Sequence, residues 1–325
     1  MSACKEGSVV KDLPPSEDGS SWEIVDVQGR GDEASVLLKR EVKDKWMEFA
    51  FLEPDGKVVQ VAQVPEAAQY AFSVAPLRMP SGKRCAVYVV SGGSLHLACD
   101  DGTSEDSGIK IDGGSKAELF PIVDPGGDMI LFGANFASLT MVMRLADGTW
   151  GESPQAQSSI SWPTSTAEDS ETTILCFINS AGHAVVRSLG RGEITSSGKA
   201  TRCNVAVDAS SVHVLLDTGF ATIPLSAVDG GAGTFDVKSP LPSGLVIAMA
   251  SVGGKPFTVM IDLTTLKVLR VALATGVATD LGTKDNAITY RARFDEESRA
   301  LTVVSLPSLS GIQTVRIAEY CTADW

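Results

Sequence analysis

The sequence predicts an all-β protein built from seven similar repeat units, and four observations support this. Short runs of strand-forming residues alternate with turn residues almost without a break from Trp22 onward. No stretch shows the sustained 3.6-residue apolar period of an amphipathic helix. The central turns of successive units recur about every 44 residues. The 31 glycines fit many short strands joined by tight turns.

The clearest repeat unit contains the stretch from Thr172 to Leu189. Two apolar runs, 174–178 and 184–186, flank the turn residues 179–182, which is a β-hairpin signature. The first run is unbroken, so we expect its strand to be buried on both faces. His183 beside the turn is then expected to be structural.

Residues 1–21 are predicted to be a polar arm with one strand candidate at 8–13, and residues 22–325 a single domain. The strands expected in the first three units are 22–27, 34–40, 46–52 and 57–63; then 69–74, 84–90, 94–99 and 108–112; then 117–123, 128–134, 138–145 and a weak strand near Trp150. The later units are expected at 158–162 with the hairpin, and a loop at 163–171; then 202–207, 211–216 and 220–225; then 234–239, 245–250, 256–263 and 266–273; then 287–294, 299–305 and 312–320.

A four-strand unit with this period is typical of a β-propeller blade. One four-stranded sheet cannot cover both of its own faces, whereas a ring of sheets covers each face with a neighbour. The predicted fold is therefore a seven-bladed β-propeller of four-stranded antiparallel blades. Because the seventh unit has only three clear strands, we expect the N-terminal arm to pair beside strand 312–320 and close the ring.

The sixth unit also carries a family resemblance. Its strand 258–263, the following Thr264-Thr265 and Leu269 resemble the third and fourth strands of a WD40 repeat, with Ile261 where that family usually has tryptophan. From Trp22 to Tyr320 the chain thus resembles a degenerate WD40-like seven-bladed β-propeller. The resemblance implies a protein-interaction scaffold.

Charge and hydropathy exclude several classes of function. With 27 basic and 40 acidic side chains, the net charge of −13 disfavours direct nucleic-acid binding. The basic residues Arg40, Lys43 and Lys45, and the pair 83–84, are interpreted as solvated loops. No window approaches 18 uninterrupted apolar residues and no N-terminal signal is visible, so neither membrane insertion nor secretion by the usual route is expected.

The six cysteines are widely scattered, without C-x-x-C or zinc spacing. Several lie in apolar strand runs, where a free thiol is usually a small core residue. A reducing compartment, the cytoplasm or nucleus, is therefore expected.

The sequence identifies no catalytic residue, metal site, cofactor or small-molecule substrate. The histidines, at 96, 183 and 213, lie in or beside strands and are interpreted as locally hydrogen-bonded. The aspartates at 124, 147, 217 and 295 occupy turns, where their side chains bond nearby backbone. The acidic run 100–106 misses the spacing of an EF-hand loop and is interpreted as an exposed turn.

Surface recognition is the remaining class of function. Candidate partner-binding residues lie in three loops and are Trp46, Asp100, Asp101, Glu105 and Trp162. The preferred hypothesis is a non-catalytic scaffold, one subunit of a larger intracellular complex with other proteins. Two alternatives remain open: a carbohydrate-binding or glycoside-hydrolysing propeller, and a reader of peptides or modified residues.

Overall fold

We describe the protein from a computed structural model. The structure describes residues 6–15, 19–28, 34–42, 46–65, 73–90, 92–111, 118–123, 126–134, 138–152, 157–158, 165–168, 172–189, 191–231, 233–238, 244–284, 287–295, 299–307 and 313–322. The chain divides into two compact parts, Met1–Gly133 with Leu139–Ala156 and Asp285–Asp324, and Ala134–Ser138 with Gln157–Lys284 and Trp325. Each part is described by itself below.

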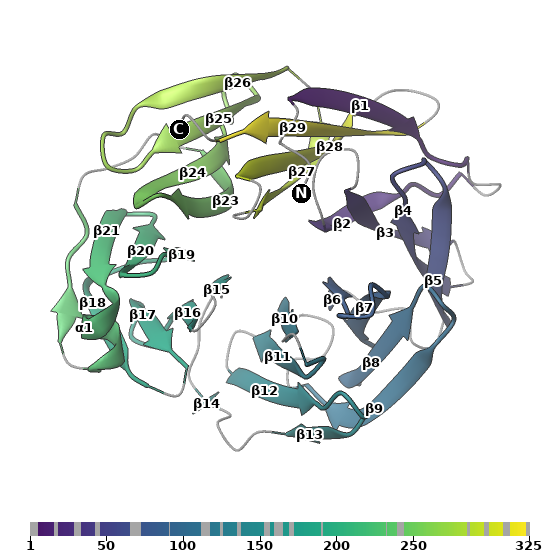
Figure 1. Ribbon diagram of the computed structural model, residues 1–325, viewed down its shortest axis with the longest axis horizontal. Coiled ribbons are helices and arrows are strands. Elements are labelled where there is room, and N and C mark those ends of the chain that lie inside the picture. Colours follow the sequence, from purple (N-terminus) through teal and green to yellow (C-terminus); the bar gives the residue numbers. More distant parts are fainter. Residues whose placement is uncertain are drawn as a thin grey trace. The chain divides into compact units, whose positions relative to one another are not determined.

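Four sheets belong to the first part (Figure 1). Sheet 1 contains β2 (Glu23–Gln28), β3 (Ser35–Val42), β4 (Trp46–Leu52) and β5 (Val58–Pro65); sheet 2 contains β6 (Ser73–Arg78), β7 (Arg84–Val89), β8 (Ser94–Cys99) and β9 (Ser104–Lys110). Sheet 3 contains β10 (Glu118–Val123), β11 (Met129–Ala134), β12 (Ser138–Arg144) and β13 (Trp150–Glu152); sheet 7 contains β27 (Ala287–Asp295), β28 (Ala300–Pro307), β29 (Thr314–Cys321) and β1 (Gly7–Asp12).

Three sheets belong to the second part (Figure 1). Sheet 4 contains β15 (Ser165–Glu168), β16 (Thr173–Ile178), β17 (His183–Ser188), β18 (Glu193–Lys199) and β22 (Thr234–Phe235); sheet 5 contains β19 (Cys203–Val207), β20 (Ser211–Leu216) and β21 (Gly219–Pro224); sheet 6 contains β23 (Leu245–Val252), β24 (Lys255–Ile261), β25 (Lys267–Ala272) and β26 (Ala278–Lys284). The short strand β14 (Gln157–Ser158) and the helix α1 (Leu225–Asp229) complete the elements. Within the described residues no helix is long and apolar enough to cross a membrane.

The middle strands of the sheets are buried because neighbouring sheets cover them. In β16, every residue from Ile174 to Ile178 is at most 3% exposed, as the unbroken apolar run predicts. One apolar core joins sheets 4 and 5, a second joins sheets 2 and 3, and a third joins sheets 7 and 1. The prediction of seven repeated antiparallel sheets is confirmed.

The N-terminal arm pairs as predicted. Strand β1 lies antiparallel to β29 as the outer strand of sheet 7, from Gly7 opposite Glu319 to Asp12 opposite Thr314. Beyond it, the Leu13 N–H donates to the Gln313 carbonyl at 2.8 Å. Leu13 and Trp22 are each 2% exposed in the core that joins sheets 7 and 1. The two ends of the chain are thereby tied together.

Two strand assignments made from the sequence were wrong, and two further strands were not predicted. The expected loop 163–171 contains β15, which pairs with β16. The segment 234–239 is not the first strand of the sixth unit, because β22 pairs parallel with β18. The outer strands β18 and β26 had no predicted counterpart. An outer strand such as β18 consists largely of polar residues, several of them exposed. It therefore lacks the apolar run by which an inner strand is recognised in the sequence.

The free-thiol interpretation of the cysteines was also wrong. Cys85 and Cys99, which are cross-strand partners in β7 and β8, form a disulfide. Cys176 of β16 and Cys203 of β19 form a second disulfide, which links sheets 4 and 5 across Cα atoms 5.8 Å apart. Cys321 is disulfide-bonded as well, and none of the described cysteines is free.

Deleting residues 1–13 is expected to lower the melting temperature by at least about 4 °C. The deletion removes β1 from the edge of sheet 7 and the buried Leu13 side chain from the core. Val10→Ala is the matched control, because Val10 lies on the same strand but is 60% exposed. Thermal unfolding followed by circular dichroism measures both variants, and an unchanged melting temperature after the deletion would contradict the closing role of β1.

Alkylation of the protein at lysis is expected to leave Cys85, Cys99, Cys176, Cys203 and Cys321 unmodified, since each is disulfide-bonded. Denaturation followed by reduction should then expose all five thiols to a second, heavier reagent. Mass spectrometry of the peptides distinguishes the two labels. Modification by the first reagent would restore the free-thiol interpretation.

Candidate functional site

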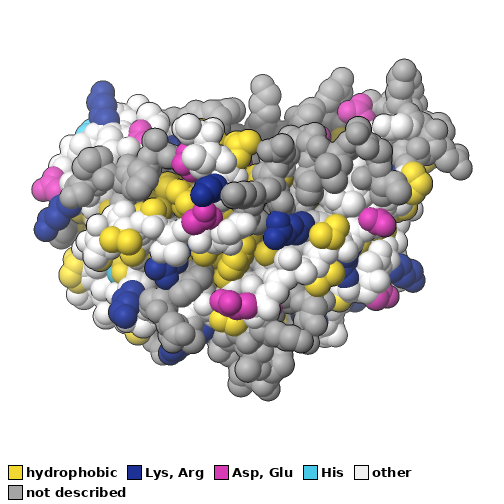
Figure 2. All heavy atoms as spheres, turned by 90° about the horizontal axis from the view of Figure 1, so that it is seen from above, with side chains coloured by type: hydrophobic (Ala, Val, Ile, Leu, Met, Phe, Trp, Pro, Cys, Tyr) yellow, Lys and Arg dark blue, Asp and Glu magenta, His cyan; other side chains and the backbone are white. Residues whose placement is uncertain are grey.

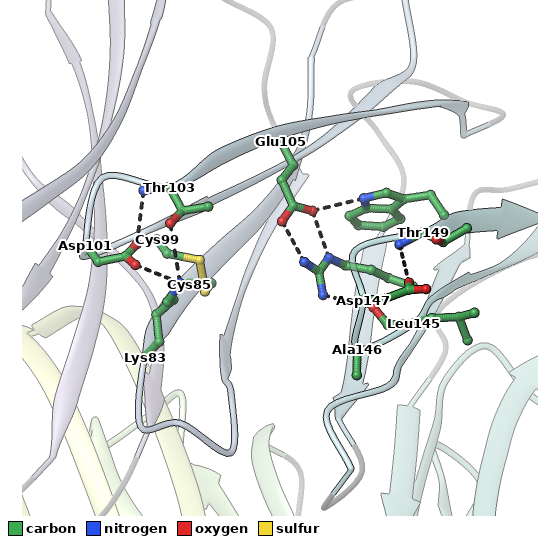
Figure 3. Close-up of polar contacts among 12 residues, drawn as sticks. Lys83, Cys85, Cys99, Asp101, Thr103, Glu105, Leu145, Ala146, Asp147 and Thr149 are labelled. Carbon is green, nitrogen blue, oxygen red and sulfur yellow. Dashed lines mark hydrogen bonds and ion pairs between the residues drawn. A yellow bond between two sulfur atoms is a disulfide. The ribbon is translucent and has the colours of Figure 1, made fainter.

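A small cleft lies where sheets 2 and 3 meet, beside the acidic run singled out in the sequence. Its volume is about 280 Å³. The side chains that close it come from β8, β9, β12 and the adjoining turns (Figure 3). The lining residues of this inter-sheet cleft are Met79, Pro80, Ser81, Lys83, Leu97, Cys99, Thr103, Glu105, Gly126, Gly127, Arg144 and Ala146.

Glu105 and Arg144 join the two sheets across the cleft. The Arg144 guanidinium donates through Nε at 2.8 Å and Nη2 at 2.6 Å to the two carboxylate oxygens of Glu105. The Trp150 indole N–H donates to the same carboxylate at 3.0 Å. The Arg144 hydrogen bond lowers the pKa of Glu105 while burial opposes it, and Glu105 in turn raises the pKa of Arg144. Both groups are thus held firmly ionised.

Lys83 and Asp101 form a second ion pair at the rim, with Nζ and Oδ2 2.7 Å apart. Asp101 also accepts from the Thr103 backbone N–H at 3.0 Å, which fixes the tight turn after β8. The Lys83 hydrogen bond is the largest cause that lowers the pKa of Asp101. The Cys85–Cys99 disulfide joins β7 to the end of β8, the strand from which this turn begins (Figure 3).

A second acidic turn lies across the cleft, after β12. The Asp147 carboxylate accepts from the Thr149 backbone N–H at 2.8 Å, and this bond lowers the pKa of Asp147. The Ala146 N–H donates to Asp128 at 2.7 Å, which ties the turn to the residue just before β11. The cleft is therefore flanked by two aspartates, Asp101 and Asp147, whose orientation is set by their own backbone.

These groups can bind charge but are poorly suited to transfer protons. A general acid or base needs a pKa near the working pH, and each of these shifts moves a pKa away from neutrality. In the parts of the chain that the structure describes, no three His, Cys, Asp or Glu side chains gather closely enough to hold a metal ion. The arrangement favours recognition of a charged surface.

The structure brings two of the predicted site residues to the cleft. Glu105 lines it and Asp101 stands at its rim. Asp100 instead bonds Arg84, at 2.9 Å to Nε and 2.8 Å to Nη2, and does not line the cleft. Trp46 opens β4 in sheet 1, outside the cleft. Trp162 lies outside the described residues.

Sequence reasoning missed three basic residues that organise this region. Lys83 and Arg144 line the cleft, and Arg84 pairs with both Asp100 and Glu53, which joins sheets 1 and 2. The interpretation of 83–84 as a solvated loop was wrong for Arg84, whose side chain is 22% exposed. One signal was available for Arg144: it follows Glu105 by 39 residues, close to one repeat.

The histidines at 183 and 213 are hydrogen-bonded locally, as predicted. His213 is buried between Asp208, at 2.7 Å from Nε2, and Thr222, at 3.1 Å from Nδ1. His183 Nδ1 lies 2.9 Å from the Ser196 carbonyl. Both rings therefore hold neighbouring strands together.

Replacing Glu105 with Gln should destabilise the protein at pH 7 by about 1–2 kcal/mol, because the charge-assisted bonds to Arg144 weaken. A carboxylate with a lowered folded-state pKa stabilises the fold above its unfolded pKa of about 4.3, and this contribution is lost as pH falls through the folded-state pKa. The difference in melting temperature between wild type and Glu105→Gln should therefore shrink below about pH 4.

The control for this pH series is Glu41→Gln. Glu41 is exposed and makes no ion pair within the described residues. The melting temperature of Glu41→Gln should equal that of wild type at every pH. If the difference in melting temperature between wild type and Glu105→Gln stays constant from pH 7 to pH 3, the carboxylate charge does not support this contact.

Comparisons with known proteins identify the fold. No family model matches the chain, and no curated protein sequence matches it. Among solved structures, the WD40 domain of SCAP from fission yeast has a TM-score of 0.54 at 10% identity, over 96% of this chain and 98% of that one. The Dos1 propeller has a TM-score of 0.55 at 11% identity, over 95% of this chain and 81% of that one.

An oligogalacturonate lyase in complex with manganese is similar to the same degree, with a TM-score of 0.55 at 9% identity over 98% of both chains. Enzymes and non-enzymes thus share this architecture, and identities this low carry no function from one protein to another. What they share with this chain is the arrangement of strands. The protein is a seven-bladed β-propeller that is similar in fold to WD40 domains.

Proposed function

We propose that this protein is a non-catalytic interaction scaffold, a propeller subunit of a larger protein assembly. The observation that carries the proposal is the pairing of the ionisable groups at the inter-sheet cleft. Lys83 with Asp101 and Arg144 with Glu105 form ion pairs, and these pairs lower the pKa values of the two carboxylates. Such pairs make a rigid, pre-organised surface, which lowers the entropy cost of docking a partner.

The partner surface that suits this site is basic. Asp101 and Asp147 are anchored at turn tips on the two sides of the cleft, and the whole chain carries a net charge of −13. On the face drawn in Figure 2, basic and acidic side chains are interspersed rather than gathered into one basic patch. A partner protein with exposed Lys or Arg side chains would complement the aspartates and be steered toward them.

The cellular location is a separate part of the proposal. Cytoplasm or nucleus was expected from free cysteines, and that basis fails because the described cysteines are disulfide-bonded. Disulfides persist mainly in oxidising compartments. The scaffold role does not depend on the compartment, and the alkylation experiment described above decides between the two environments.

The test is affinity purification of the tagged full chain from its own cells, as wild type and as an Asp101→Lys, Asp147→Lys double variant. Wild type is expected to retain partner chains in stoichiometric amounts. The double variant should retain them at about a tenth of that level, because two like charges then face the basic partner. Quantitative mass spectrometry of the retained chains gives the ratio.

An equal change of charge elsewhere controls for non-specific effects. Asp55→Lys with Glu41→Lys alters two exposed acidic residues of sheet 1, and Asp55 bonds its own turn as Asp101 does. This pair should retain partners at the wild-type level. Absence of any stoichiometric partner of wild type, together with glycan binding or turnover on a carbohydrate array, would reject the scaffold and favour the carbohydrate alternative.

A further inference from the structure

Sheet 5 has no outer strand among the residues that the structure describes. Among the seven sheets formed by the described residues, it is the one with three strands, β19, β20 and β21, whereas the others have four or five. Its last strand, β21, therefore forms an edge of the sheet, with α1 following it in the chain (Figure 1). Strand edges carry backbone groups that can pair with another chain.

The register of β21 shows which backbone groups face outward. Along an antiparallel strand, alternate residues direct their N–H and C=O to opposite sides. Phe220 exchanges two hydrogen bonds with Lys238, at 3.1 and 2.7 Å, so its backbone faces the outer edge. Because the direction alternates, the backbone groups of Thr222 and Pro224, two and four residues further along, face the same outer edge. Within the described residues, no backbone partner bonds the N–H or C=O of Thr222.

The chain itself explains why this edge stays open. The segment after α1 could run along β21, but among its described residues it pairs there only at Lys238. Its earlier residues Thr234 and Phe235 pair with β18 of sheet 4, and the Phe235 side chain is 7% exposed in the core joining sheets 4 and 5. Burial of that aromatic ring draws the segment away from Thr222.

A hollow of about 770 Å³ lies along this open edge. One wall is β21, another is β22 with α1, and the third is the turn that follows β25. Most of the lining side chains are apolar or small. The lining residues are Ile194, Phe220, Ala221, Thr222, Ile223, Pro224, Ala227, Thr234, Phe235, Asp236, Lys238, Leu273, Ala274, Thr275 and Gly276.

We propose that this hollow takes an extended, apolar peptide segment of a partner protein, which adds to β21 as the fourth strand of sheet 5. The proposal rests on the scaffold function and names the form of one partner. An extended strand presents backbone donors and acceptors at the spacing that the Thr222 N–H and C=O require, whereas a folded helix uses its own internally. The apolar lining selects side chains that lose water contact on entry.

The open edge is short, and its two ends limit how a strand can add. At one end, the backbone of Lys238 already bonds the N–H and C=O of Phe220. Pro224 has no N–H to offer at the other end, and proline is a residue that protects edge strands from uncontrolled pairing. The register of an added strand is thereby centred on Thr222.

Two substitutions at one position separate backbone pairing from side-chain effects. Thr222→Pro removes the outward N–H but no bond to β20, because the backbone of residue 222 faces away from β20. Thr222→Val keeps that N–H and loses only the hydroxyl that bonds His213. Ala274→Arg, a third variant, fills the hollow from the opposite wall without changing β21.

The probe is a phage-displayed library of random heptapeptides selected against the immobilised wild-type chain. The enriched peptides are synthesised with a fluorophore and titrated by fluorescence polarisation against all four proteins. We expect at least about tenfold weaker binding to Thr222→Pro and to Ala274→Arg, and binding to Thr222→Val within about threefold of wild type. The circular dichroism spectrum of each variant is recorded to check that it folds. If Thr222→Pro does not fold, the binding of the peptides to Ala274→Arg tests the proposal.

Three outcomes would overturn the inference. The first is that no peptide is enriched, and the second is that the peptides bind wild type and Ala274→Arg equally. The third is a wild-type dimer in size-exclusion chromatography that Ala274→Arg dissociates, because the occupant would then be a second copy of this chain. Affinity purification separates this failure from failure of the scaffold proposal. If Ala274→Arg retains every partner of wild type, the scaffold stands without a peptide at β21. If wild type retains none, the scaffold itself is rejected.

Discussion

Burial of the apolar central strands between neighbouring sheets is the constraint on which the rest of the structure depends. Strand β16 shows it most clearly, since its apolar residues from Ile174 to Ile178 are almost fully enclosed. Each such side chain contributes about 1.5–3 kcal/mol only if a neighbouring sheet covers it. Sheets 4 and 5 supply that cover for each other, as do sheets 2 and 3 and sheets 7 and 1. The repetition of sheets is therefore required by packing, because each sheet needs a neighbour to cover its apolar face.

The polar contacts between sheets refine an arrangement that the apolar cores already establish. Arg84 bonds Glu53 of sheet 1, and Arg144 bonds Glu105 of sheet 2 with its side chain 10% exposed. Two half-buried charges contribute little net stability, but leaving one of them unpaired is costly. These pairs thus fix the relative position of neighbouring strands and turns. The same rigidity makes the turns at Asp101 and Asp147 suitable for recognition.

The edges of the sheets are where this chain departs from a regular repeat. In sheet 7 the outer position is taken by β1, from the far end of the chain. In sheet 4 an additional strand, β22, is held by the burial of Phe235, and sheet 5 is left with an open edge. Outer strands bury one face at most, so small local gains decide which segment occupies them. Functional variation can accumulate there without disturbing the inner strands.

The sequence by itself determined the all-β class, the seven units and the hairpin of β16 and β17, because apolar runs and turn residues act locally. The pairing of the N-terminal arm followed from counting strands, since the seventh unit had only three. The sequence also selected Asp101 and Glu105. Only the tertiary structure decided that Arg144 lies against Glu105, that Asp100 turns to Arg84, that Cys176 meets Cys203, and that β22 pairs with β18 and leaves the outer edge of β21 open at Thr222. Each of these depends on contacts between different strands, and such contacts are not encoded in the local pattern of any single strand.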